Sequence, residues 1–390
     1  MSSSREESPT KRQMEDDETP RPRRKRIQYP RSDSSYSLAS RSQASEHSGL
    51  AGRLSPQKHL NALELGNEGI VVRELASLRD PPTSLAGLLK TMRQISRGRH
   101  IIDSASRIEL GKHTHPAIVE IAEDDACFSP SRGDLGHVPD STSILNVLDA
   151  AIECQENFHA ESSWNMLVHS QLLQLALHQP GAPSFSHFVN YMPCSTASIL
   201  PNYLPPYSPS KKVDFCIYLE PAREPTSDTS QLAATQSLIQ TARVHLAGNV
   251  INHTDYYPLR QRPMALGIET KKTGEGWDSA ALQIGVWHVA HWDLLTELSR
   301  TDTQDETVSD VQPQKARLPE FLPGLIIQGH DWYLVVTTRE ASQTILWTKL
   351  TIGTTSNVMG IYQIILGLQV LRRWAQYTYW PLFRQLIMPK

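Results

Sequence analysis

The chain has 390 residues, and its 38 basic and 41 acidic side chains leave a formal net charge of −3. This balance says little about partners, although it argues against a strong general DNA binder. The chain has no apolar run of the about 18–20 residues that a bilayer span needs and no secretory signal at its start, so we expect a protein that is neither membrane-bound nor secreted.

Cysteine usage excludes two further classes. The four cysteines are scattered, without a CxxC pair: Cys127, Cys154, Cys194 and Cys216. This spacing argues against a zinc knuckle and against a disulfide framework, and it favours reduced thiols inside the cell.

Residues 1–55 are rich in Ser, Arg, Glu and Pro and have almost no aliphatic side chains, so we predict a disordered tail. Within this tail, Lys11-Arg12 and Arg23-Arg24-Lys25-Arg26 are separated by ten residues. This is the spacing of a bipartite import signal, which predicts an import receptor as a partner and a nuclear location. A solvated basic run that touches nucleic acid nonspecifically is the alternative, and the location would then be cytoplasmic.

Residues 56–390 are predicted to form a single domain, whose core spans about 144–350. Ser84–Ser96 has the apolar spacing of an amphipathic helix. Residues 144–178 are also predicted to be helical, with a break near Asn157. Glu161 lies on the apolar stripe of the second part, three residues before Trp164. A glutamate there needs a partner or a metal, or it lies in the first helical turn and favours the helix dipole; the sequence leaves both open.

Three strands are predicted next, at Ser184–Met192, Lys212–Leu219 and Ala265–Lys272. Because side chains alternate along a strand, Glu269 and Lys271 share one face of the third strand. If the second and third strands are neighbours, Asp214 of the second joins them. Two acids beside a lysine suit a hard divalent cation. The 55 residues from Asp214 to Glu269 then require an insertion, about 220–262, that lies outside the sheet.

A long helix is predicted at Asp278–Ser299, with Asp278 as its N-cap and Gln283 pointing towards the sheet. His288 and His291, three residues apart on this helix, fit ordinary core or surface histidines better than a metal pair. The remaining predicted elements are three strands and a closing helix: Gly324–Gln328, Trp332–Thr337, Thr344–Leu350 and Gly353–Tyr379. We interpret His330-Asp331 as part of a turn and the aromatic end of the closing helix as packing.

The order of these elements, a helix, three strands, a helix and a strand, resembles the αβββαβ core of the PD-(D/E)xK nuclease superfamily. The chain is more closely similar to the fungal PD-(D/E)xK nuclease-like domain family, over about residues 60–385. Six blocks, in order, carry this resemblance: Glu161–His169, Val213-Asp-Phe215, Ile268-Glu-Thr-Lys271, Leu282–Trp287, Leu322-Pro-Gly324 and Gln328–Tyr333. A proline often precedes the aspartate in the superfamily, and here that position is Val213.

The resemblance implies an α/β fold of the restriction-endonuclease type, with a central mixed sheet flanked by helices. It implies that Asp214 and Glu269 hold Mg²⁺ or Mn²⁺, with Glu161 and the Thr270 carbonyl as additional ligands. Lys271 would orient or deprotonate the attacking water and stabilise the charged phosphorane, and Gln283 would lie near the lysine or the phosphate. The implied function is hydrolysis of DNA or RNA; the alternative is an inactive nuclease fold that binds nucleic acid or protein.

Overall fold

The structure is a computed structural model that describes residues 55–388 except 67–68, 207, 209, 227, 275 and 301–316. The predicted tail and its two basic clusters therefore lie outside the described residues, apart from residue 55. All elements below belong to the compact unit Gly52–Lys390.

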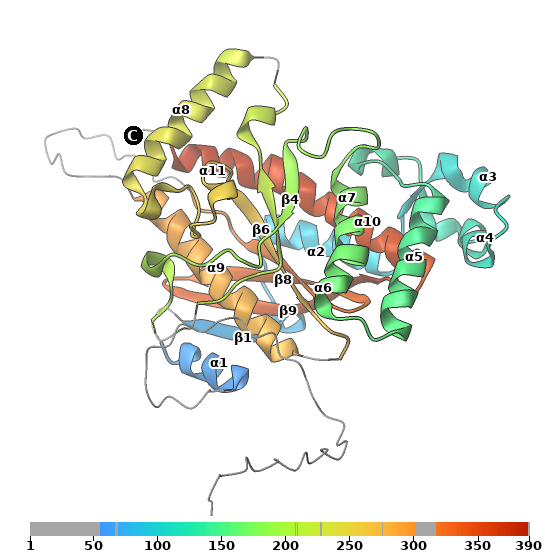
Figure 1. Ribbon diagram of the computed structural model, residues 1–390, viewed down its shortest axis with the longest axis horizontal. Helices are drawn as coiled ribbons and strands as arrows, with labels where there is room; N and C mark the ends of the chain where they lie inside the picture. Colours follow the sequence, from blue (N-terminus) through green and yellow to red (C-terminus); the bar gives the residue numbers. More distant parts are fainter. Residues whose placement is uncertain are drawn as a thin grey trace, which may run out of the picture. The chain divides into compact units, whose positions relative to one another are not determined.

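Within the described residues, a seven-stranded sheet forms the centre of this unit, in the order β1-β9-β8-β7-β6-β5-β4 (Figure 1). The strands are β1 (Ile70–Glu74), β4 (Val189–Pro193), β5 (Phe215–Leu219), β6 (Met264–Lys271), β7 (Leu322–Gln328), β8 (Asp331–Glu340) and β9 (Gln343–Thr354). The pairs β6–β7 and β1–β9 are parallel, and the other neighbours are antiparallel. A mixed sheet flanked by helices is therefore confirmed.

The predicted order of the core elements is also confirmed. A helix leads into β4, β5 and β6, the long helix α9 follows, and β7 closes the parallel crossover. The first helix has three consecutive parts: α6 (Glu161–Trp164), a π-helical segment (Asn165–His169) and α7 (Ser170–Leu177). It follows α5 (Ser141–Glu156), and the predicted break lies between Glu156 and Glu161.

The insertion between β5 and β6 lies outside the sheet, as the sequence required. It contains α8 (Thr229–His245) and a loop that returns to β6. Asn252 ties this loop together: its amide nitrogen donates to the carbonyls of Leu259 (2.6 Å) and Arg262 (3.0 Å), and its amide oxygen accepts from the Met264 N–H (2.8 Å). β5 and β6 can therefore pair directly although 44 residues separate them (Leu219 to Met264).

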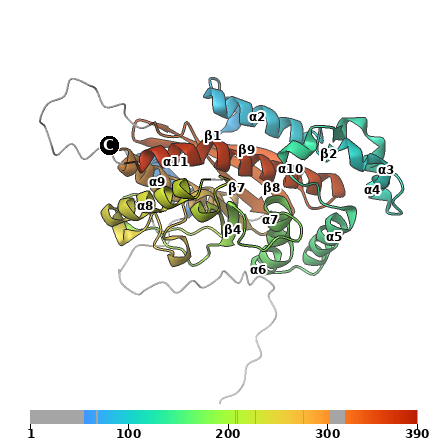
Figure 2. The same cartoon turned by 90° about the horizontal axis from the view of Figure 1, so that it is seen from above.

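Helices cover both faces of the sheet, as Figures 1 and 2 show from two directions. Thr337 of β8 faces α9 (Trp277–Ser299), where it bonds to His288 and Trp292. Trp332, an odd number of residues away on the same strand, packs instead against His169 at the other face. α10 (Val358–Trp374) contacts α7 and β9 and is followed by a π-helical segment (Ala375–Tyr379) and α11 (Trp380–Leu386).

The remaining α-helices and strands of the described residues lie early in the chain. They are α1 (Pro56–Glu64), α2 (Thr83–Ser96), α3 (Arg107–Leu110), α4 (Pro116–Glu123) and a two-stranded sheet of β2 (Ile102–Asp103) and β3 (Phe128–Ser129). The helix predicted at Ser84–Ser96 is thus confirmed. The edge strand β1 was not predicted.

Several predicted boundaries were wrong, among them the start of β4, which is Val189 and not Ser184. Three others have identifiable reasons. α9 begins at Trp277, after Gly276 in the left-handed region (φ 71°), so Asp278 lies in the first turn and not at the N-cap. The closing helix begins at Val358, because Asn357 caps it by accepting from the Gly360 N–H (2.8 Å). The preceding strand β9 extends to Thr354 instead of ending at Leu350.

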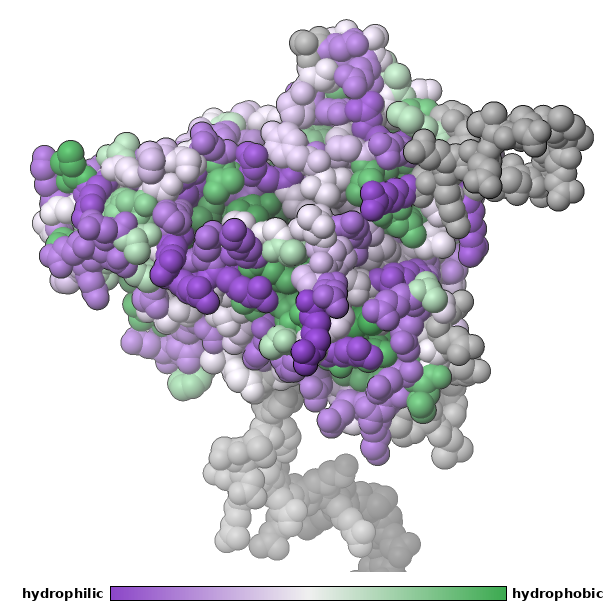
Figure 3. Space-filling view, turned by 180° about the vertical axis from the view of Figure 1, so that it is seen from behind, coloured by the Kyte–Doolittle hydropathy of each residue, from purple (hydrophilic) through white to green (hydrophobic). Residues whose placement is uncertain are grey.

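The two histidines of α9 are buried, and so is most of the aromatic end of the closing helix, although Tyr377 is exposed. His288 bonds through Nδ1 to the Thr337 hydroxyl (2.9 Å) and His291 through Nε2 to the Tyr379 hydroxyl (2.8 Å). Trp374 and Trp380 are buried as well. The face shown in Figure 3 mixes hydrophilic and apolar residues, as is usual for a hydrated surface. Over the described part of the chain, none of the helices combines the length and apolar character that a bilayer crossing needs.

Candidate active site

Asp214 lies where the β5–β6 ladder ends. The last regular pair is Phe215 with Ile268, so Asp214 is opposite Glu269, and its N–H donates to the Ile268 carbonyl (3.0 Å). Its carboxylate Oδ2 accepts from both the N–H (2.8 Å) and the hydroxyl (2.9 Å) of Thr270. The side chain thus replaces a backbone acceptor, which explains why β5 begins at Phe215 and not at Lys212 as predicted.

Glu269 and Lys271 extend from the end of β6 on the face that α9 covers, since Gly267 on the same side lies against Trp287. Glu269 is 1 % exposed. The Lys271 ammonium donates to Glu269 Oε1 and to the Thr270 carbonyl (2.7 Å). Directly opposite residues of an antiparallel pair have Cβ atoms about 5 Å apart, so Asp214 joins this pair. The structure therefore brings the three predicted residues together.

Glu161 reaches the same place from the helix on the other face of the sheet. Its Oε2 lies 3.8 Å from Lys271 Nζ, and its side chain is 36 % exposed. It is the first residue of α6, so the helix-dipole interpretation of the sequence also holds. The Glu161 side chain thus lies near a charged partner and also in the first turn of its helix, so the two interpretations do not exclude each other.

A chain of contacts fixes the Glu161 helix relative to β6. His169 Nε2, in the π-helical segment, lies 3.2 Å from the Gly329 carbonyl, and the Gly329 N–H donates to the Lys271 carbonyl (2.9 Å). Burial lowers the pKa of His169 to about 4, so the imidazole is neutral and donates from Nε2. A π-helical segment inside an α-helix often occurs at functional sites, and here it aims His169 at the turn between β7 and β8.

The turn requires a glycine at position 329. The φ of Gly329 is +56°, and a Cβ atom would collide with the Thr273 hydroxyl. The next residue, His330, packs edge-on against Trp164 of the Glu161 helix, with ring centroids 5.0 Å apart. The predicted turn at His330-Asp331 is therefore present, and it links the Glu161 helix to the end of β6.

Gln283 points towards the sheet, but it contacts the segment of the chain that precedes Asp214. Its amide nitrogen donates to the Lys212 carbonyl (3.2 Å), and its amide oxygen accepts from the Ser279 hydroxyl (3.1 Å). Lys212 lies before the first residue of β5, outside the pairing of β5 with β6. Its carbonyl therefore accepts from Gln283 of α9 in place of a backbone N–H of β6. Its contacts are those of a residue that positions Asp214.

The carboxylates of Asp214, Glu269 and Glu161 lie among three lysines, Lys211, Lys271 and Lys272, which act on them electrostatically. Burial raises the pKa of Glu269 well above its ordinary value, the Asp214 carboxylate raises it further, and Lys271 opposes both. The pKa of Glu161 is raised by burial and by Asp214 against Lys271. Burial lowers the pKa of Lys271, but Glu269 and Glu161 raise it more, so the net shift is upward. The three carboxylates therefore all stabilise the charged form of Lys271.

The donor set fits a hard divalent cation in chemistry. It offers carboxylate and carbonyl oxygens, and Glu269 Oε2 is buried with no hydrogen-bond partner among the described residues. Within those residues, however, no three His, Cys, Asp or Glu side chains are arranged closely enough to hold a metal ion. In this arrangement Asp214 Oδ2 accepts from Thr270, and the Lys271 ammonium donates to Glu269 Oε1.

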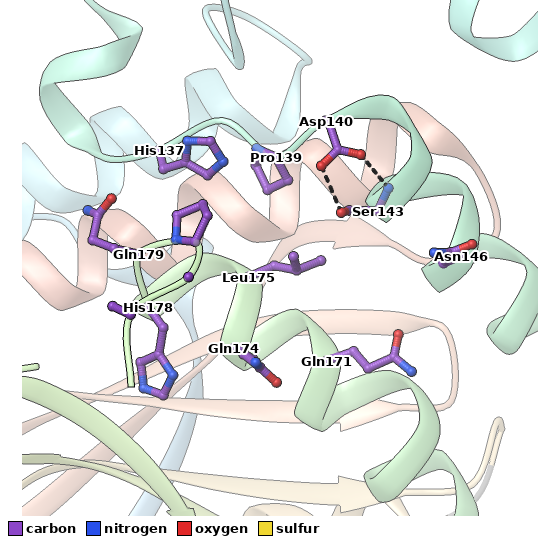
Figure 4. Close-up of a pocket in the computed structure, with 13 residues that line it drawn as sticks. His137, Pro139, Asp140, Ser143, Asn146, Gln171, Gln174, Leu175, His178 and Gln179 are labelled. Carbon is purple, nitrogen blue, oxygen red and sulfur yellow. Dashed lines mark hydrogen bonds between the residues drawn. The ribbon is translucent and has the colours of Figure 1, made fainter. Parts of the chain in front are cut away.

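A cavity of about 320 Å³ lies elsewhere, between the start of α5 and the end of α7 (Figure 4). Asp140 and Ser143 bond to each other on one side, and Leu175 and His178 lie on the other. His178 is 17 residues after Glu161, about 25 Å along the helix at 1.5 Å per residue. This cavity is therefore not part of the acid–lysine site.

Some neighbours of the site were not predicted from the sequence. His169 and Gly329 belong to blocks that resemble the family but were given no role. The cluster of Trp277, Tyr333 and Lys349 was missed altogether: the Lys349 ammonium lies 4.5 Å from the centre of each ring. Trp277 is the first residue of α9, whereas Tyr333 and Lys349 lie on β8 and β9. Tertiary structure brings them together, so no local pattern in the sequence marks them.

Fold and site together define a nuclease-like α/β protein with acids and a lysine at the end of a central strand. A family model described as the PD-(D/E)XK nuclease superfamily matches residues 113–380. This chain belongs to the PD-(D/E)XK nuclease superfamily. The search of curated proteins found no match, and the search of solved structures found none either.

Proposed function

We propose that this protein is a metal-dependent nuclease that hydrolyses phosphodiester bonds of DNA or RNA. The observation that carries the proposal is the meeting of Asp214, Glu269 and Lys271 at one end of β6, with Glu161 beside them, in a chain of this superfamily. Asp214 and Glu269 would hold Mg²⁺ or Mn²⁺, assisted by Glu161 and the Thr270 carbonyl.

Phosphodiester hydrolysis adds negative charge to the phosphate, and the site is built to compensate it. The bound ion would polarise a phosphate oxygen and lower the pKa of a coordinated water. The Lys271 ammonium would donate from Nζ to that water or to a phosphate oxygen. Gln283 would keep Asp214 in place through the Lys212 carbonyl, and His169 would keep Glu161 in place through Gly329.

A nucleic-acid substrate is supported by the cluster of Trp277, Tyr333 and Lys349. Trp277 directly follows Gly276, whose Cα packs against the Lys271 side chain, and its ring is perpendicular to that of Tyr333 (87°). Tyr333 pairs with Ile326, and Ile326 pairs with Glu269, so Tyr333 is two strands, or about 10 Å, from the acid. Two half-exposed rings and an exposed lysine at that distance suit a neighbouring nucleotide.

Cleavage by purified full-length protein tests the proposal. Plasmid, duplex, single-stranded DNA and RNA would be incubated with Mg²⁺ or Mn²⁺ and with EDTA. We expect metal-dependent cleavage of at least one substrate, and a loss of about 10²-fold or more in Asp214→Asn and Lys271→Ala. Equal cleavage by all three proteins would reveal a contaminant and contradict the proposal.

A binding module without nuclease activity is the second candidate. The observation that favours it is the lack, among the described residues, of three metal-ligating side chains in binding geometry. Retained binding of nucleic acid without cleavage of any substrate would support this module. Its partner would then be nucleic acid or another protein.

We propose a nuclear location from the two basic clusters of the tail, Lys11-Arg12 and Arg23–Arg26. The test is the location of full-length protein with a fluorescent tag. Replacing both clusters by alanine should shift it out of the nucleus, whereas an unchanged location would contradict the proposal.

A further inference from the structure

The ammonium of Lys271 lies among oxygens that also suit a divalent cation. It donates to Glu269 Oε1 and to the Thr270 carbonyl (2.7 Å), and it lies 3.8 Å from Glu161 Oε2. Carboxylate and carbonyl oxygens are hard donors, the kind of ligand that divalent cations such as Mg²⁺ prefer. An ammonium and a divalent ion cannot share them at contact distance, because like charges repel.

The Lys271 side chain is also confined. It is 17 % exposed, and Gly276 packs against its stem, so a Cβ atom there would lie 3.0 Å from Lys271 Cδ. The neighbouring Lys272 differs in both respects, because it is exposed and its charge acts on Glu161 only through space. The two adjacent lysines thus allow a contact effect to be separated from a general charge effect.

We propose that Lys271 competes with the divalent cation for the oxygens of Glu269 and Thr270, so that cation binding requires the ammonium to leave them. This inference rests on the proposed function. Its consequence is an order of assembly: the lysine becomes free to donate to substrate only after the cation has taken its place. The site therefore binds metal more weakly than its acids alone would.

Direct titration with Mn²⁺, without nucleic acid, tests this competition. Binding to full-length protein would be followed by the loss of the free-ion signal in electron paramagnetic resonance and by calorimetry. Lys271→Met keeps the length of the side chain and removes its charge, and we expect it to bind Mn²⁺ about tenfold more tightly than the wild type. Lys272→Met should change affinity by less than about threefold, and Lys271→Arg should show no gain.

The outcomes separate this inference from the proposed function. If the wild type binds Mn²⁺, Asp214→Asn does not, and Lys271→Met binds no more tightly than the wild type, the competition is refuted while the metal site stands. Equal gains in Lys271→Met and Lys272→Met would also refute it, because a general charge effect would suffice. If neither the wild type nor Lys271→Met binds Mn²⁺, the proposed metal-dependent function fails as well. Circular dichroism would establish that each variant is folded.

Discussion

At the scale of single residues, the site is a set of side chains that compensate each other. The Asp214 carboxylate accepts two hydrogen bonds from Thr270 where a backbone carbonyl would otherwise accept. The Gln283 amide nitrogen donates to the carbonyl of Lys212, which lies outside the strand pairing. The sequence indicated Asp214, Glu269 and Lys271 because charges inside apolar strands are costly and need a reason. It did not indicate the Gln283 contact, which depends on β5 beginning three residues later than predicted.

We expect Gln283→Leu to lower kcat by about 10- to 100-fold, as is typical of residues that hold a ligating group in place. Its thermal unfolding should change little, because Gln283 is half-buried and the leucine keeps the volume. Ser279→Ala is the matched control, since it removes only the bond to the amide oxygen. Steady-state kinetics on the best substrate would measure both. An unchanged kcat in Gln283→Leu would show that the Lys212 contact does not matter.

At the scale of elements, the helix of Glu161 and the strand of Lys271 are joined through one turn. His169 contacts the Gly329 carbonyl, and the Gly329 N–H bonds to Lys271. The sequence predicted the helix, the strand and the turn, because each has a strong local period or a turn residue. The π-helical segment and the contacts between these elements are tertiary, so no local pattern could predict them.

Gly329→Ala should destabilise the protein by about 2–4 kcal/mol, because it combines a positive φ with a collision at the Thr273 hydroxyl. The double variant with Thr273→Ala should recover part of this loss, since it removes the collision and leaves the backbone strain. Urea unfolding would measure all four members of the cycle. Additive effects would mean that the two residues do not meet in this way.

The cluster at the start of α9 carries a second prediction at this scale. In a catalytically inactive Asp214→Asn background, Trp277→Leu should weaken binding of a single-stranded oligonucleotide by about 5- to 50-fold, the value of one stacked base. Duplex binding should change less, because paired bases cannot stack on the ring. Fluorescence anisotropy would compare the two substrates. Equal losses for both would assign Trp277 a structural role.

At the scale of the whole molecule, buried neutral histidines make the fold sensitive to acid. Burial lowers the pKa of His253 and of His288 to about 3 and that of His169 to about 4. The unfolded chain takes up these protons near the ordinary pKa of 6.5 and the folded chain does not. The free energy of unfolding should therefore fall as the pH drops below about 6.5, by up to about 1.4 kcal/mol per pH unit for each histidine.

Glu269 acts in the opposite direction, because its raised pKa removes a buried charge as the pH falls, so it reduces the slope that the histidines produce. Urea unfolding at pH 8, 6.5 and 5 would measure it. His288→Asn should reduce the slope below pH 6.5 by about 1.4 kcal/mol per pH unit. Equal stability at pH 6.5 and pH 5 would contradict this account of the core.

We propose that Asp214 and Glu269 hold one divalent ion at the end of β6. A crystal structure of the protein with Mn²⁺, with anomalous diffraction data, would show whether they do. We expect one anomalous peak within about 2.0–2.4 Å of an oxygen of each carboxylate, the range of hard-cation bonds to oxygen, with the Lys271 ammonium moved off Glu269. A peak bound elsewhere, or no peak at saturating Mn²⁺, would contradict the claim.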